Sequence, residues 1–202
     1  MADSFAPSIT PKEIELLPKA EFKGEIVIID QIGRRYYSAI KHLKKEKIIG
    51  FDTETKPQFE ASAVHNMVAL LQLSTADRAY LFRVNEIGIP KGLESILTDP
   101  EIIKVGAACR DDFHGLREYG PFQEQGVVDL QTMVKNYGIT DQSVKKMAAI
   151  ILGVRISKSQ QLSNWEAFHY SDAQKLYAAT DAWICREMYL KLLESGTSES
   201  TD

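Results

Sequence analysis

The stretch Ile48–Thr55 constrains this chain most, because an apolar run ends there in two carboxylates. Side chains two residues apart in a strand share one face. Asp52 and Glu54 are therefore expected side by side at a strand end, with Phe51 pointing the other way into the core. Two carboxylates this close repel each other without a counter-charge, and oxygen ligands of this kind suit Mg²⁺ or Mn²⁺. The alternative interpretation is a strand that runs out into solvent with two acids at its tip.

Length and composition predict one globular domain. The chain has 202 residues, of which 44% are apolar, enough for a sizeable core. We expect no membrane span and no signal peptide, because no segment has the required apolar length or the required order of charged and apolar residues. Cys109 and Cys185 lack metal or redox spacing and are expected to be buried, which fits a cytoplasmic location. At a net charge of −4, binding to a polyanion requires a local basic patch or bound metal.

Hydrophobic periodicity and turn residues predict an α/β domain with a mixed central sheet flanked by helices. An antiparallel meander is expected over 48–84, followed by alternating strands and helices. The predicted strands are 25–30, 48–54, 67–74, 78–84, 102–106 and 126–130, and the predicted helices are 33–45, 91–97, 111–118, 130–137, 142–152 and 171–194. Residues 1–24 are expected to form an N-terminal arm with a capped helix start at Thr10, and 195–202 a disordered C-terminal tail, which leaves 25–194 as the domain.

Two further segments carry acids where chemistry is expected. Asp111 and Asp112 follow a strand of small residues. A helix cap explains Asp111 well but Asp112 less well, because one cap is enough. Tyr177 and Asp181 lie one helical turn apart on the same face, among small alanines that allow close packing. An acid on the buried side of a helix needs a partner. The alternative is a surface aspartate with a tyrosine packed above it.

Together these segments resemble the DEDD superfamily of 3′–5′ exonucleases, in the tyrosine branch that includes ribonuclease D and the exonuclease domain of the Werner helicase. The motif matches are Phe51-Asp52-Thr53-Glu54, Asp112 and Tyr177-x-x-x-Asp181, with supporting matches at Val68–Leu73, Val128-Asp129-Leu130, Lys158-Ser159 and Asn164-Trp165. The resemblance covers about residues 25–194 and implies a ribonuclease H-like fold. The histidine branch would require a histidine where this chain has Leu176. Either Asp111 or Asp112 can serve as the second-motif acid, and alignment with the family favours Asp112.

The resemblance implies a metal-dependent enzyme that releases nucleoside monophosphates from nucleic-acid 3′ ends by two-metal-ion hydrolysis. The implied cofactors are two divalent ions, Mg²⁺ or Mn²⁺. The implied metal ligands are Asp52, Glu54, Asp112 and Asp181, and the catalytic residues are these four acids and Tyr177. Asp52 is expected to bridge both ions, Glu54 and Asp181 to hold the ion that activates water, and Asp112 to hold the ion on the leaving-group side. Tyr177 is expected to orient the attacking water.

Substrate contacts are expected from Thr53, Met67, Lys158 and Trp165. Lys158 would meet a backbone phosphate and Trp165 a base, since stacking on aromatic rings tolerates any base. The alternative for Trp165 is a packing residue that anchors the loop before the last helix. Further candidates are Phe59, His65 and Asn66. His114 is expected to be an exposed helix residue without a role in the site. Asp129 is expected to be a structural residue at a strand end, and Asp141 a structural helix cap.

The expected partner is a single-stranded or recessed nucleic-acid 3′ end, with DNA slightly favoured over RNA. Two alternatives stand beside the exonuclease. One is a catalytically silent module that binds nucleic acid or protein with the same fold, and the complete set of acids argues against it. The other is a different nuclease or transferase on the same sheet, and the motif of Tyr177 and Asp181 argues against that. The modest charge predicts weak, salt-sensitive substrate binding.

Overall fold

A mixed sheet of six strands forms the centre of the computed structural model, which describes residues 5–58 and 65–197. The strand order is β1-β4-β3-β2-β5-β6. β3 runs antiparallel to β2 and β4, and the other neighbours are parallel, so the predicted meander and mixed sheet are confirmed. The strands are β1 (Glu25–Ile29), β2 (Ile48–Thr55), β3 (Val68–Ser74), β4 (Arg78–Phe82), β5 (Ile103–Gly106) and β6 (Val127–Asp129).

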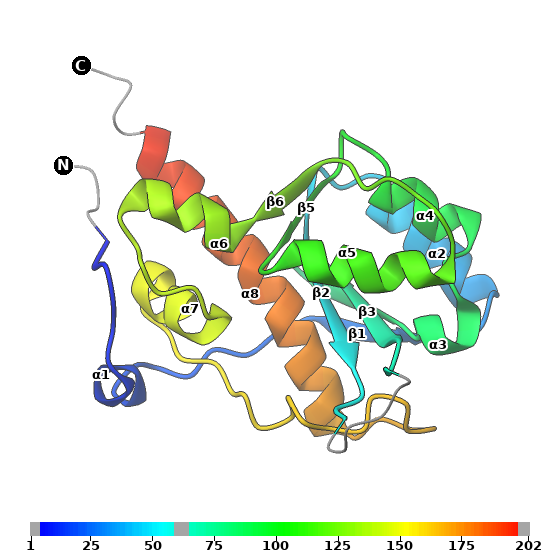
Figure 1. Cartoon of the computed structure of the whole chain (residues 1–202), viewed down its shortest axis with the longest axis horizontal. Coiled ribbons are helices and arrows are strands. Elements are labelled where there is room, and N and C mark those ends of the chain that lie inside the picture. The colour runs from blue at the N-terminus through cyan, green and yellow to red at the C-terminus, as the bar shows by residue number, and fades with distance from the viewer. Residues whose placement is uncertain (1–4, 59–64, 198–202) are drawn as a thin grey trace.

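Helices cover both faces of the sheet (Figure 1). One face carries α2 (Arg34–Leu43), α4 (Lys91–Leu97) and α5 (Cys109–Leu116), with the short α3 (Val84–Ile87) beside them. The long helix α8 (Asp172–Thr197) runs diagonally across the other face, next to α7 (Val144–Leu152) and α6 (Leu130–Met133). Within the described ranges, none of the helices has the length and apolar character needed to cross a bilayer.

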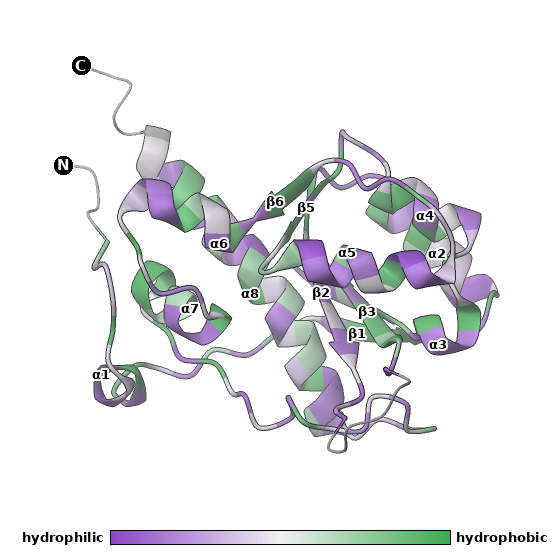
Figure 2. Cartoon of the chain, viewed as in Figure 1, coloured by the Kyte–Doolittle hydropathy of each residue, from purple (hydrophilic) through white to green (hydrophobic). Residues whose placement is uncertain are grey.

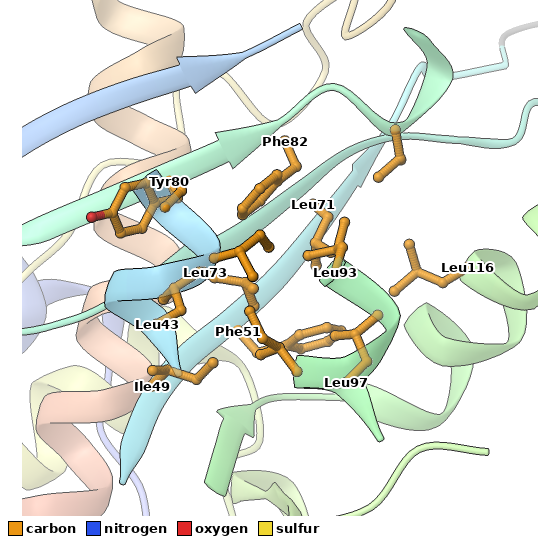
Figure 3. Close-up of a cluster of buried hydrophobic side chains, with 14 of the residues drawn as sticks. Leu43, Ile49, Phe51, Leu71, Leu73, Tyr80, Phe82, Leu93, Leu97 and Leu116 are labelled. Carbon is orange, nitrogen blue, oxygen red and sulfur yellow. The ribbon is translucent and has the colours of Figure 1, made fainter. Parts of the chain in front are cut away.

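The core between the sheet and α2, α4 and α5 is built from alternate residues of the strands. Phe51 is fully buried there and stacks on Phe113 of α5, with ring centroids 4.6 Å apart and planes 8° apart. Figure 3 shows Phe51 among leucines from β3, α2 and α4. Burial of each large apolar side chain contributes about 1.5–3 kcal/mol. Hydrophobic residues mark β5 and β6, while hydrophilic residues mark the outer side of α5 (Figure 2).

The N-terminal arm packs on the domain over residues 5–24. Its short helix α1 (Pro11–Glu15) has the predicted capping box, in which Thr10 and Glu13 satisfy each other's backbone N–H groups. Phe22 is buried against Ala79 and Ala179, and its N–H donates to Thr180 Oγ1 at 3.1 Å. The arm is thus anchored to the same helix that carries Asp181.

Two predictions at the C-terminal side are wrong. Ser195 does not start a tail, because α8 continues to Thr197 and the Ser195 hydroxyl donates back to the Lys191 carbonyl; residues 198–202 lie outside the described part. Asp141 is not a helix cap, because Ser143 caps α7. Asp141 instead accepts the Ile9 N–H at 3.0 Å and pairs with Lys146 at 2.6 Å. The predicted helix 130–137 divides into α6 and a 3-10 turn (Val134–Tyr137).

Helix α8 approaches β2 unusually closely at Gly50. A Cβ built on Gly50 would lie 1.8 Å from the carbonyl oxygen of Ala182, so no side chain fits there. On the α8 side Ala178, Ala179 and Ala182 are fully buried, as the pattern of small residues predicts. The contact sets the depth at which α8 lies on the sheet.

We predict that Gly50→Ala lowers the free energy of unfolding by about 3 kcal/mol, because the added methyl group forces the two backbones apart. Denaturant-induced unfolding followed by circular dichroism measures the change. Gly33→Ala is the matched control, since no atom lies within 4 Å of a Cβ at Gly33. Equal stability of the two variants would contradict the role of this contact.

Candidate active site

Three carboxylates meet between β2 and α8. Asp52 and Glu54 lie on the face of β2 that α8 covers, and Asp181 projects from α8. One ligand oxygen from each lies within 4.8 Å of the others. Glu54 is 9% and Asp181 3% exposed, while Asp52 is half-buried. The structure therefore brings together, from two segments far apart in sequence, three of the four acids that the sequence singles out.

Burial and mutual repulsion disfavour the charged forms of these acids. Burial, and then the charges of Asp52 and Asp181, raise the pKa of Glu54 to about 10. Burial raises the pKa of Asp52 well above its usual range, and Asp181 raises it further. Burial also raises the pKa of Asp181, and Lys158 opposes that effect through an ion pair of 2.6 Å between Lys158 Nζ and Asp181 Oδ2.

The donor set fits a divalent cation. Asp181 Oδ1 is buried and has no hydrogen-bond partner among the described residues, although its other oxygen binds Lys158. A single lysine does not balance three converging carboxylates. All of the donors are hard oxygens, which Mg²⁺ and Mn²⁺ prefer. Asp52, Glu54 and Asp181 are therefore the residues that would hold a metal ion here.

Asp112 lies beside this cluster without joining it. Thr53, which is next to Asp52 in β2, donates its hydroxyl hydrogen bond to Asp112 Oδ1. Asp112 is close enough to raise the pKa of Asp52, and burial raises its own pKa to about 6. Asp111 is exposed. Of the two adjacent acids, Asp112 is thus the one that faces the site.

The predicted cap role of Asp111 is wrong, because α5 begins two residues earlier. Ala108, with φ 59°, precedes the helix, and the N–H of Cys109 donates to Asp129 Oδ2 at 2.9 Å. Asp129 also caps α6 through the N–H of Gln131. The structural role expected for Asp129 is confirmed, and this acid at the end of β6 fixes the turn from which Asp112 projects.

Tyr177 is buried beside Asp181. Its ring packs at 5.9 Å from Trp165, and Lys158 Nζ lies 5.3 Å from its centroid. Burial, and then the negative charges of Asp181 and Glu54, raise the pKa of Tyr177 above its usual value. The hydroxyl therefore keeps its proton and can donate a hydrogen bond in the site, which favours orientation of a water over its deprotonation.

The residues expected to contact substrate differ in exposure. The stacking role predicted for Trp165 is wrong in this structure, because the ring is fully buried against Tyr170 and Tyr177; it is a packing residue. Met67 is 37% exposed and stays a candidate. The phosphate contact of Lys158 stays a prediction, since its amine binds Asp181 here. Phe59 lies outside the described residues.

A hollow of about 620 Å³ opens between the end of β2 and α5, and its lining includes Asp112 but not Asp52, Glu54 or Asp181. Thr53 and Asp112 line it at the acidic side, and His65, Asn66 and the exposed His114 line it further out. Sequence reasoning missed Glu118, which lines the same hollow and lies 2.9 Å from His65 Nε2. No local pattern marks Glu118, because it meets His65 only in the folded chain.

Gln72 is a second residue that sequence reasoning left without a role. It stands opposite Asp52 in the β2–β3 ladder and is fully buried, and neither polar atom of its amide has a partner among the described residues. A buried amide without hydrogen bonds is costly. The available signal was a lone polar residue within the apolar run Val68–Leu73.

The raised pKa of Glu54 makes the stability of the metal-free protein depend on pH. The folded pKa of about 10 exceeds the usual value of 4.5, so folding retains a proton that the unfolded chain releases. This contribution to stability is complete below about pH 4.5 and is lost as the pH rises toward 10. We predict that in EDTA the free energy of unfolding falls from pH 5 to pH 9, and that Glu54→Gln makes the fall shallower by up to about 1.4 kcal/mol per pH unit.

Chemical unfolding across this pH range measures the two slopes. Glu101→Gln serves as the control, because the Glu101 side chain is 80% exposed. Its slope is expected to match that of the unmodified protein. A slope that Glu54→Gln leaves unchanged would contradict the electrostatic description of the site.

Comparison with known proteins identifies the fold and the family. The sequence profile described as 3′-5′ exonuclease matches residues 33–196. The chain is 28% identical over 192 residues to the mouse bifunctional 3′-5′ exonuclease/ATP-dependent helicase WRN, covering 87% of this chain and 13% of that protein. It is 33% identical over 194 residues to the exonuclease 3′-5′ domain-containing protein 2 of Drosophila melanogaster, covering 94% and 31%.

Among solved structures, the fold resembles that of RNase D from Escherichia coli, with a TM-score of 0.76, 22% identity, and coverage of 88% of this chain and 47% of that one. The expected ribonuclease H-like sheet is thereby confirmed. The chain spans less than half the length of the curated relatives that it matches. With its acids placed as described and its profile matched over most of its length, the chain belongs to the 3′-5′ exonuclease family of hydrolases.

Proposed function

We propose that the chain is a metal-dependent 3′–5′ exonuclease that hydrolyses the terminal phosphodiester of a nucleic acid and releases nucleoside monophosphates. The observation that carries the proposal is the convergence of Asp52, Glu54 and Asp181 within 4.8 Å. Asp112 and Thr53 connect this cluster to the adjoining hollow. A terminal nucleotide in that hollow would lie beside Asp112, which lines it.

Each residue of the site has a distinct task in this proposal. Two divalent cations, Mg²⁺ or Mn²⁺, would supply the charge that acidifies water and stabilises the developing negative charge on phosphate. Asp52 would help to hold both ions, Glu54 and Asp181 would hold the ion on the water side, and Asp112 would hold the ion on the leaving-group side. The protonated hydroxyl of Tyr177 would orient the attacking water.

Lys158 would change partners when metal and substrate enter. Its amine neutralises one oxygen of Asp181 in the metal-free protein at 2.6 Å. A cation bound by Asp181 would weaken this pair, and the flexible amine would be free to meet a substrate phosphate. Thr53 would hold Asp112 in place through its hydroxyl, and Met67 would offer a partly exposed apolar side chain to the substrate.

The substrate is proposed to be a single-stranded or recessed 3′ end, with DNA slightly favoured over RNA. Similarity to the exonuclease–helicase supports DNA, whereas the fold that the chain shares with an exoribonuclease keeps RNA as the second candidate. Discrimination would require a contact with the 2′-hydroxyl. A reducing, cytoplasmic compartment stays a prediction, supported by the two free and buried cysteines.

The test is degradation of 5′-labelled substrates, a 3′-recessed DNA duplex and a single-stranded RNA, in Mg²⁺, Mn²⁺ or EDTA. We predict laddering from the 3′ end that requires metal and shows which polymer is preferred. Asp52→Asn should reduce the rate about 10³-fold or more, because several kcal/mol of transition-state stabilisation depend on the metal ligands.

Asp112→Asn and Asp111→Asn form a matched pair on neighbouring residues of α5. The first should cause a large loss of activity and the second a change of only a few-fold, because Asp111 is exposed while Asp112 binds Thr53. A folded protein that cleaves neither substrate with either metal would overturn the exonuclease proposal and favour the silent binding module.

A further inference from the structure

A second hollow lies at the same edge of the sheet as the acids. β1, β4 and β2 run in the same direction. The C-terminal ends of β1 and β4 therefore lie on the same side of the sheet as the C-terminal end of β2, which carries Asp52 and Glu54. Strands are about 4.8 Å apart, which puts the end of β4 about 10 Å from that of β2. The segment before α8 lies at this end of the molecule (Figure 1).

Three cations line this second hollow of about 340 Å³. Its lining includes Arg35 from α2, Arg83 from the end of β4 and Lys175 from α8, against the single carboxylate of Asp30. Arg83 is paired with Glu86 at 3.2 Å, so Arg35 and Lys175 are the cations of this hollow that can meet a ligand. Lys175 pairs at 3.0 Å with Asp172, whose side chain is fully exposed, and such surface pairs are weak and readily exchanged.

Buried Arg83 fixes the wall of the hollow. Its guanidinium donates to the carbonyls of Ala167 and Phe168, at 3.0 and 2.8 Å, and lies 5.1 Å from the ring centroid of Tyr170. The Arg83 side chain is only 6% exposed, and its Nε has no partner among the described residues. The backbone that carries Phe168 is therefore held by a charged group, and a preordered segment loses less entropy on binding.

Phe168 presents an aromatic ring to solvent at this wall. It is 81% exposed, the most exposed aromatic among the large hydrophobic side chains in the described part of the chain. The ring of His169 meets it edge-on at 4.5 Å. An exposed ring beside a basic groove is the combination that holds single-stranded nucleic acid, in which bases stack and phosphates meet cations.

We propose that Phe168, Arg35 and Lys175 form an accessory site for the single-stranded segment of the substrate that lies away from the scissile bond. This inference rests on the proposed function and extends it to substrate length. A base stacks on Phe168, and Arg35 and Lys175 contact the phosphates on either side. A strand of several nucleotides spans both sites, whereas a dinucleotide reaches the acids alone.

Binding is measured by fluorescence anisotropy with labelled dodecathymidylate and dodecauridylate, in the Asp52→Asn background and EDTA, so that no cleavage is required. Phe168→Ala is expected to weaken binding of the dodecamers roughly 5- to 100-fold. The double variant Arg35→Ala/Lys175→Ala should reduce the slope of log K against log salt by about 1.4, because each phosphate that a cation neutralises on a single strand contributes about 0.7 to that slope.

Controls match each change. Leu162→Ala removes another apolar side chain from the same segment, one that is 69% exposed, and Lys44→Ala/Lys47→Ala removes two exposed cations at the opposite edge of the sheet. Both should bind like the parent. In the unmodified background, Phe168→Ala should cleave a dinucleotide at the parent rate but a dodecamer with a higher KM.

Several results would overturn the accessory site. One is dodecamer binding that Phe168→Ala and the double variant leave unchanged, and another is an equal loss on a dinucleotide. Competition by inorganic phosphate as effective as that by the oligonucleotides would indicate a small-anion site instead. Failure of the proposed function gives a different result, because the unmodified protein then cleaves neither the dinucleotide nor the dodecamer. The comparison of dodecamer binding by the parent and the variants still tests the accessory site in that case.

Discussion

The backbone of α8 touches the backbone of β2 at Gly50, and the geometry of the site depends on this contact. A side chain at Gly50 would collide with the Ala182 carbonyl, which follows Asp181 directly in the helix. Because the two backbones meet there, Asp181 reaches the carboxylates that end β2. Small residues on the buried side of α8 thus have an electrostatic consequence, since they bring three acids within 4.8 Å.

The same packing holds three mutually repelling carboxylates close together in the metal-free protein. Burial alone disfavours three carboxylates, and their proximity raises the pKa values further. Lys158 offsets part of the charge by binding Asp181, and the hydroxyl of Thr53 satisfies Asp112. Repulsion of this kind lowers the free energy of unfolding of the metal-free protein. A bound cation raises that free energy, because the ion stabilises the folded state by mass action.

The sequence predicted those parts of the fold and the site that depend on neighbouring residues. Alternation and turns placed the meander, and the spacing of Asp52 and Glu54 put both on one face of β2. The sequence pattern did not predict contacts between segments that lie far apart in the chain. The cap of α5 comes from Asp129, 20 residues after Cys109, so Asp111 looked like the cap. Lys158 meets Asp181 across 23 residues. The exposure of Trp165 and Phe168 depends on how one segment folds over α8, which no periodicity encodes: Trp165 is fully buried and Phe168 is exposed.

Anomalous diffraction from crystals grown with Mn²⁺ tests the central claim most directly, that the contact at Gly50 assembles a metal centre. The account predicts manganese density between β2 and α8, with Asp52, Glu54 and Asp181 as ligands and with Lys158 displaced from Asp181. Crystals of Asp181→Asn should lose part of that density. Manganese absent from this position at saturating concentration, with Lys158 still bound to Asp181, would contradict the account.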